Sequence, residues 1–112
     1  MYIIISGMNN ITINLAKKLI TEGNEITFVD LNQNKSQEIE KTIGFVNVLG
    51  NAFKKSTLVE AGIERADFFV ASNLKDEINF LSVQLAKHLN NEIISITLVN
   101  TTPNKQFFLG DE

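Results

Sequence analysis

Short apolar runs alternate with helical patterns five times along the chain. The runs are rich in Ile, Val, Phe and Thr, which is typical of parallel strands that are buried on both faces. The predicted strands are 2–6, 26–30, 45–49, 67–72 and 93–98. Strict alternation of strand and helix predicts an α/β fold. In this fold a doubly wound parallel sheet with strand order 3-2-1-4-5 lies between two helical layers.

Helices are predicted between and after these strands, at 10–22, 34–42, 54–61, 75–89 and 102–109. In the first helix, Ile11, Leu15 and Leu19 recur four residues apart and should face the sheet. Gly23 follows where a left-handed C-terminal cap is expected. The fourth helix should bury a stripe formed by Ile78, Leu81, Leu85 and Leu89.

Small and polar residues follow four of the predicted strands at the point where each strand ends. They are 6–12, 30–32, 50–52 and 72–73. In a doubly wound sheet, ligands bind beyond the carboxyl ends of the strands, at the switch point between the first and fourth strands. Because four separate segments agree, the sequence predicts a ligand site at this edge of the sheet.

The loop after the first strand has the layout of a dinucleotide-binding βαβ unit, which makes the predicted fold Rossmann-like. It keeps only one of the three glycines of that motif. Gly7 supplies the tight turn, whereas Asn9 and Thr12 stand where the second and third glycines would be. The Asn9 side chain occupies space that a phosphate needs, and the β-branched Thr12 should hold the helix away from the sheet. The simpler alternatives are that Gly7 is an ordinary turn residue and that Asn9 or Asn10 caps the helix.

Asp30 ends the second strand, 18 residues after Thr12. This is near the offset of the acid that binds the ribose hydroxyls of a dinucleotide. A carboxylate here disfavours a 2′-phosphate, so NAD or an adenine nucleotide is expected rather than NADP. Asn51, which follows Gly50, could reach an adenine edge. A solvated Asp and a plain turn Asn would give the same pattern.

Composition narrows the function classes. A length of 112 residues fits one domain, 1–112, and leaves little chain to hold a substrate. The domain therefore either senses or binds a ligand, or it is a fragment of a longer protein. A net charge of −3 with scattered lysines argues against nucleic acid. Cys is absent and His88, late in a helix, is the only His, so no His/Cys metal site or catalytic triad is expected. The apolar runs are too short for direct membrane insertion.

Two later segments carry a resemblance to a known family. The sequence LVEAGIERAD at 58–67 is similar to an LxxAGIxxAD stretch, and DEIN at 76–79 is similar to a DExN motif. Together with IIISG at 3–7, DLN at 30–32 and VLGNA at 48–52, they make nearly the whole chain resemble the TrkA-N domain, also called the RCK N-terminal domain.

The resemblance implies a regulatory module of a potassium transport or channel system, not an enzyme. Such domains bind NAD(H) or ATP/ADP at the strand mouth, and nucleotide exchange gates ion flow. They assemble as homodimers or higher homo-oligomers on a membrane transporter or channel subunit, so a cytoplasmic location, peripheral at the inner face of the cell membrane, is implied. The cofactor-binding residues expected in this chain are Gly7, Met8, Asn9, Asn10, Ile11, Thr12, Asp30, Leu31, Asn51, Ala52 and Ser72.

The chain departs from the family pattern at three places. Two loop glycines are missing, Asn51 stands where the family has an Asp, and the strand at 93–98 lacks an Arg often found there. Two alternatives therefore stay open. One is an RCK-like domain that has lost nucleotide binding and serves as a dimerisation or interaction module. The other is a fragment of an NAD-dependent oxidoreductase.

Overall fold

The structure is a computed structural model that describes residues 1–32 and 46–98. Its centre is a sheet of five parallel strands in the order β3-β2-β1-β4-β5. The strands are β1 (Tyr2–Ser6), β2 (Glu25–Asp30), β3 (Val46–Leu49), β4 (Phe68–Ala71) and β5 (Ile94–Thr97). The predicted strand order and direction are confirmed, and each boundary lies within one residue of its prediction, apart from Phe45, which is outside the described residues.

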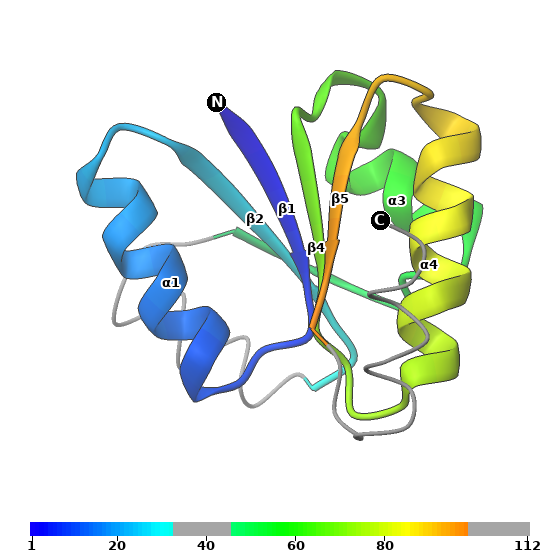
Figure 1. Ribbon diagram of the computed structural model, residues 1–112, viewed down its shortest axis with the longest axis horizontal. Coiled ribbons are helices and arrows are strands. Elements are labelled where there is room, and N and C mark those ends of the chain that lie inside the picture. Colours follow the sequence, from blue (N-terminus) through cyan, green and yellow to red (C-terminus); the bar gives the residue numbers. More distant parts are fainter. Residues whose placement is uncertain (33–45, 99–112) are drawn as a thin grey trace.

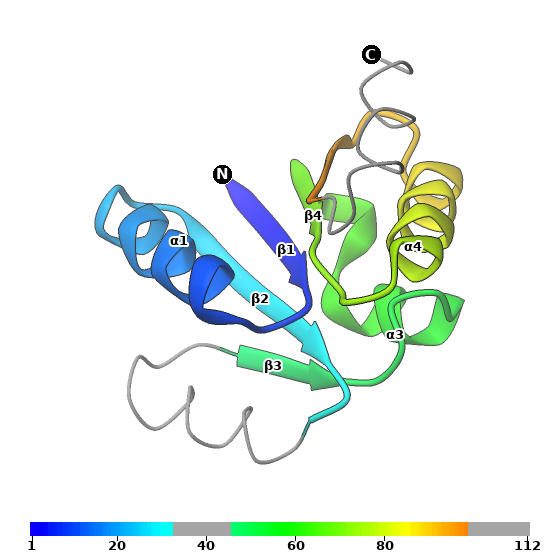
Figure 2. The ribbon, with the colours of Figure 1, turned by 60° about the horizontal axis from the view of Figure 1, so that its bottom comes forward.

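Helices lie on both faces of the sheet. They are α1 (Asn10–Thr21), α3 (Lys55–Ala61), the short 3-10 helix η1 (Ile63–Arg65) and α4 (Asp76–Leu89). Helix α1 covers one face, and α3 and α4 cover the other (Figures 1 and 2). The three-layer, Rossmann-like architecture is thereby confirmed. The predicted helices 34–42 and 102–109 lie outside the described residues.

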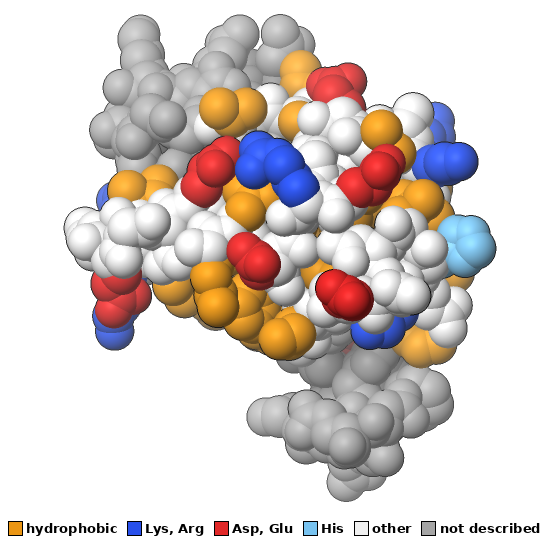
Figure 3. All heavy atoms as spheres, turned by 90° about the horizontal axis from the view of Figure 1, so that it is seen from above, with side chains coloured by type: hydrophobic (Ala, Val, Ile, Leu, Met, Phe, Trp, Pro, Cys, Tyr) orange, Lys and Arg blue, Asp and Glu red, His pale blue; other side chains and the backbone are white. Residues whose placement is uncertain are grey.

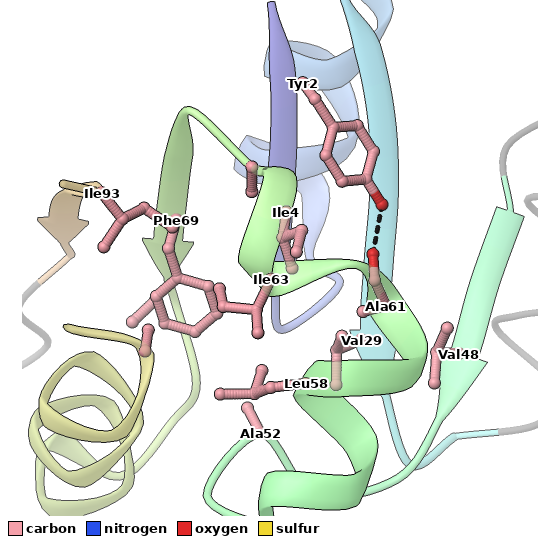
Figure 4. Packing of buried hydrophobic residues seen from close by; sticks show 13 residues of the cluster. Tyr2, Ile4, Val29, Val48, Ala52, Leu58, Ala61, Ile63, Phe69 and Ile93 are labelled. Atoms are coloured by element: carbon pink, nitrogen blue, oxygen red, sulfur yellow. Dashed lines mark hydrogen bonds between the residues drawn. The ribbon is translucent and has the colours of Figure 1, made fainter. Parts of the chain in front are cut away.

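The larger of two apolar clusters lies between the sheet and the α3/α4 layer. Ile4 and Phe69 are fully buried there against Leu58 of α3 (Figure 4). The Tyr2 hydroxyl donates a hydrogen bond to the Ala61 carbonyl and is 2.8 Å from the Thr27 hydroxyl. Successive strand residues face opposite sides of a sheet, so neighbours of Ile4 in β1 enter the second cluster, under α1. Both faces of the central strands are therefore covered.

The predicted inner stripe of α1 is wrong in part. Ile11 is 70% exposed and Leu15 is 36% exposed, whereas Thr12 and Ala16 are fully buried. Leu19 does pack against the cluster under α1. The helix turns its smallest stripe toward the sheet, because small side chains allow its backbone to approach closely. The two stripes are offset by one residue and have the same period, so hydrophobicity alone selects the wrong one.

In helix α4, too, some of the buried positions are held by small or polar residues rather than by the predicted apolar stripe. Leu85 and Leu89 pack against the larger cluster as predicted. Leu81, however, is 52% exposed, and the fully buried positions are Asn79, Ser82 and Ala86.

The edge where the strands begin carries side chains of both charges, and it is the face seen in Figure 3. Arg65 lies over the Tyr2 ring, 3.9 Å from its centre, and forms a 3.1 Å ion pair with Glu25. The hydrogen bond to Glu25 raises the pKa of Arg65 above its usual value. Nearby, the Asp67 carboxylate accepts a 2.8 Å hydrogen bond from the Tyr2 N–H. In the described part of the chain no helix is long and apolar enough to be a membrane span.

Candidate functional site

A cleft of about 530 Å³ opens at the carboxyl ends of the strands, between β1 and β4. This is the switch point at which doubly wound sheets bind ligands, and the volume lies within the usual range for ligand pockets. The lining residues are Gly7, Met8, Asn9, Asp30, Leu31, Asn32, Ser72, Asn73, Leu74, Lys75 and Ile78. Lys75 is the single cation and Asp30 the single anion among them, so the cleft carries no strong net charge.

A second hollow of about 150 Å³ adjoins the cleft on the side of β2 and β3. It is lined by Asn51 and Ala52 of the loop after β3, and it shares Asp30, Leu31, Asn73 and Ile78 with the larger cleft. Two loops that are distant in sequence are thus brought to one site. Asp30 is the charged residue among those that line both spaces.

Gly7 makes the sharp turn at the floor of the cleft. Its φ is +100°, and a Cβ atom added there would lie 2.3 Å from the backbone oxygen of Ser72. Both the positive φ and the contact with β4 exclude a side chain. The fold itself therefore requires this glycine, with or without a ligand.

Asn9 is the N-cap of α1. Its Oδ1 accepts a 2.9 Å hydrogen bond from the Thr12 N–H, and the Thr12 hydroxyl accepts a 3.0 Å bond from the Asn9 N–H. This reciprocal pair is a capping box. The φ of Asn9 is −150°, so its backbone needs no glycine-like freedom. The prediction that Asn9 or Asn10 caps the helix is confirmed for Asn9.

The other end of the Asn9 amide reaches across the switch point. Its Nδ2 donates to the hydroxyl of Ser72 at 2.9 Å and to the Ser72 carbonyl at 3.3 Å. We call this contact the Asn9–Ser72 bridge. It joins the start of α1 to the end of β4 and forms part of the cleft wall.

Thr12 fits inside the turn, contrary to the expectation that it would hold the helix away from the sheet. It is fully buried, and its hydroxyl donates a 2.9 Å hydrogen bond to the Gly7 carbonyl. The Thr12 side chain thus fills the space that the third glycine of the motif would leave, and it hydrogen-bonds the Gly7 carbonyl within the turn.

Asp30 is a structural acceptor as well as a cleft residue. Its Oδ2 accepts from the Met8 N–H at 2.8 Å and its Oδ1 from the Asn32 N–H at 2.7 Å. The alternative of a merely solvated strand-end Asp is therefore wrong. A carboxylate offers about four lone-pair sites, so two such bonds leave acceptor capacity for a ligand.

Comparison with known proteins identifies the family. The model of the TrkA-N domain matches residues 3–110. The chain belongs to the TrkA-N domain family.

The relatives give this TrkA-N domain a context. It is 33% identical over 108 residues to a Trk system potassium uptake protein TrkA homolog from Pyrococcus abyssi, covering 96% of this chain and 48% of that protein. The chain thus spans about half the length of the relative. In fold it is similar to the TrkA-N domain of the inner membrane protein ybaL from Escherichia coli (TM-score 0.87, 17% identity, 98% of this chain and 80% of that one). It is also similar to the GsuK channel bound to NAD (TM-score 0.84, 22% identity, 96% and 19%).

Asn79, in the DEIN motif of this TrkA-N domain, organises the loop between β4 and α4. Its Oδ1 accepts from the Asn73 N–H at 2.7 Å, and its Nδ2 donates to the Asn73 carbonyl at 3.0 Å. A longer contact of 3.4 Å reaches the Leu98 carbonyl after β5. Asn73 in turn donates from Nδ2 to the Ser6 hydroxyl at 2.9 Å. The side-chain amides of Asn79 and Asn73 together therefore connect the ends of β1, β4 and β5 beside the cleft.

The cleft and the adjoining hollow are lined by most of the predicted site residues, and three of them lie outside both linings. Asn10 and Ile11 are exposed at the start of α1, and Thr12 is buried below it. No described residue accepts a hydrogen bond from the N–H of Asn10 or Ile11, as expected for the first turn of a helix. Asn32 and Asn73 belong to the segments expected at this edge but were not among the predicted cofactor-binding residues, and the cleft residues missed by sequence reasoning are Leu74, Lys75 and Ile78. No described cluster of His, Asp and Glu could hold a metal ion.

Proposed function

We propose that this TrkA-N domain is a regulatory adenine-nucleotide-binding domain of a potassium transport or channel system and performs no catalysis of its own. The observation that carries the proposal is the cleft at the switch point, which is lined by the Asp30 carboxylate and by the Gly7–Asn9 loop that leads into α1. Carboxylates bind ribose hydroxyls, and helix N-termini bind phosphate. A carboxylate in the cleft and a helix that begins beside it therefore support nucleotide binding at this edge of the sheet.

The relatives support the choice of ligand and system. GsuK is a channel known with NAD and also with ADP, and the Pyrococcus protein is a potassium uptake component. We expect the complete protein to form a homodimer or higher homo-oligomer and to act on a membrane transporter or channel subunit from the cytoplasmic side. Nucleotide exchange would bias the assembly through differential affinity for its conformations.

The two adjoining spaces support one ligand pose as part of this proposal. The adenine ring occupies the smaller hollow beside Asn51, and the ribose hydroxyls donate to Asp30. The first phosphate then accepts from the N–H groups of Asn10 and Ile11. In this pose Asn10 and Ile11 contribute backbone donors rather than side chains, whereas the Thr12 N–H is already bonded to Asn9.

Thermal unfolding of the complete protein tests the proposal. NAD, NADH, ATP or ADP at a hundredfold excess over its dissociation constant should add about 2.7 kcal/mol to the free energy of unfolding. Asp30→Asn should reduce this ligand-induced rise. The matched control is Asp67→Asn, since Asp67 also accepts from a backbone N–H but lies at the opposite edge of the sheet. If none of the four nucleotides raises the melting temperature at millimolar concentration, nucleotide binding is refuted.

A second candidate function is favoured by the Asn9 cap. Because Asn9 already occupies the loop, the domain could serve as a dimerisation module without a ligand. In that case the complete protein would assemble normally while all four nucleotides leave its melting temperature unchanged. Analytical ultracentrifugation reports the oligomeric state, and together with the melting experiment it distinguishes the two functions.

A further inference from the structure

Lys75 and Asp30 line the cleft from the two strands that flank β1. Asp30 ends β2, whereas Lys75 lies in the connection from β4 to α4. Because β2 and β4 are the two neighbours of β1, their ends lie about 10 Å apart. The Gly7–Asn9 loop follows β1, the strand between them, and lines the same cleft. The acid, the loop and the cation therefore follow one another in the order of the strands.

Two other polar side chains of the cleft are already bonded within the protein. The Asn9 amide accepts from the Thr12 N–H and donates to the Ser72 hydroxyl, both at 2.9 Å. The Asn73 amide donates to the Ser6 hydroxyl at 2.9 Å. A ligand that recruited either amide would therefore break a hydrogen bond between neighbouring strand ends.

The Lys75 ammonium is not held in this way. The residue is exposed, and no described residue forms an ion pair or a hydrogen bond with its ammonium group. The next two residues of α4, Asp76 and Glu77, do not line the cleft. Lysine carries a compact positive charge on a flexible four-carbon stem, and it binds phosphate as a point charge. Lys75 can therefore reach a bound anion without giving up a contact in the described part of the chain.

We propose that Lys75 binds the second phosphate of the nucleotide, so that the site takes an adenine nucleotide with a diphosphate group in preference to AMP. This inference rests on the proposed function and narrows its ligand class. In the proposed pose the base lies beside Asn51, the ribose at Asp30 and the first phosphate at the start of α1. These three positions follow β3, β2 and β1, and the next strand in the sheet is β4, which leads to Lys75. A second phosphate continues in that direction and meets the single cation of the cleft.

Calorimetric titration of the complete natural protein with AMP, ADP and NAD tests the inference. We expect ADP to bind at least about tenfold more tightly than AMP, because a hydrogen bond to a charged group contributes that much. Lys75→Gln should weaken ADP about tenfold and AMP less than about threefold, whereas Lys75→Arg keeps the charge and should keep the preference for ADP. NAD contains the same diphosphate group, so comparison of ADP with NAD in the wild type identifies which of the two supplies it.

Lys87→Gln is the matched control. It removes the same charge from the last turn of the same helix, about 18 Å from Lys75 and outside the cleft lining. The ratio of the AMP and ADP dissociation constants should stay unaltered in this variant. Added salt should weaken ADP more steeply in the wild type than in Lys75→Gln, because salt screens the attraction between ammonium and phosphate. Equal salt dependence in these two proteins would show that Lys75 does not meet the phosphate, and would overturn the inference.

Failure of the inference and failure of the proposed function give different patterns. A wild type that binds AMP as tightly as ADP, or a ratio unmoved by Lys75→Gln, overturns the inference and leaves the nucleotide site in place. Equal effects of Lys75→Gln and Lys87→Gln also overturn it, because the overall charge of the domain would then explain the change. If the wild type binds none of AMP, ADP and NAD, the proposed function fails and the inference fails with it.

Discussion

Gly7, just after β1, lies against the backbone of Ser72, just after β4, so its substitution should destabilise the fold strongly. In Gly7→Ala the new Cβ would be 2.3 Å from the Ser72 carbonyl oxygen, at a φ of +100°. Left-handed strain costs about 1–2 kcal/mol and overpacking a further ~1–3 kcal/mol. We expect a loss of about 3 kcal/mol or more in the free energy of unfolding, measured by urea denaturation.

Gly23→Ala is the matched control for that experiment. The φ of Gly23 is +91°, close to that of Gly7, but no atom lies within 4 Å of an added Cβ. Only the backbone strain remains, so we expect a loss of about 1–2 kcal/mol. Equal losses in the two variants would show that the contact with Ser72 costs nothing and that Gly7 is only a turn residue.

At the scale of single residues, the sequence predicts where a residue lies in the fold better than it predicts its hydrogen-bond partners. The number of residues between the loop after the first strand and Asp30 predicted that Asp30 lies at the carboxyl end of the sheet, and the structure places it there. It could not predict that the carboxylate accepts from Met8 and Asn32, because those donors are backbone groups whose directions depend on the turn. For the same reason, the bridge from Asn9 to Ser72, across 63 residues of chain, has no sequence signal.

At the scale of the elements, α4 contributes to the site through one buried amide. Asn79→Ala would remove the two hydrogen bonds that the Asn79 amide makes with the Asn73 N–H and carbonyl. Each hydrogen bond contributes about 0.5–1.5 kcal/mol, so we expect a loss of about 2 kcal/mol in the free energy of unfolding, measured by chemical denaturation. Gln84→Ala, an exposed amide on the same helix, should change stability by less than about 0.5 kcal/mol. Similar values for both variants would contradict a structural role for Asn79.

The helices also show where pattern reasoning stops. Their existence and order follow from the alternation of apolar runs, but the rotation of α1 about its axis does not. Large residues such as Ile11 mark an amphipathic helix, yet contact with a sheet favours the small residues Thr12 and Ala16. Close packing, rather than total hydrophobicity, selects the buried stripe. In α4 the buried face includes Asn79, a polar residue that a search for apolar periodicity does not assign to the inner face.

At the scale of the whole molecule, the topology was predictable because few arrangements satisfy the physical rules. Parallel strands joined by helices need right-handed crossovers, and a sheet buried on both faces needs helices on both sides. The order β3-β2-β1-β4-β5 places two non-consecutive strands, β1 and β4, side by side at the centre. That pairing creates the switch point and the cleft beside it.

The same topology predicts an uneven distribution of stability, which native-state hydrogen exchange can measure. The central strands β1 and β4 are each paired on both sides, and Ile4, Ile5 and Phe69 are fully buried. In the described sheet β5 pairs on one side only, and Ile94 and Ile96 are about half exposed. Amides of β1 and β4 should therefore exchange only through global unfolding, and those of β5 through local openings at least about 1 kcal/mol lower in free energy. Equal opening free energies in all three strands would contradict this, because the edge strand would then unfold only with the core.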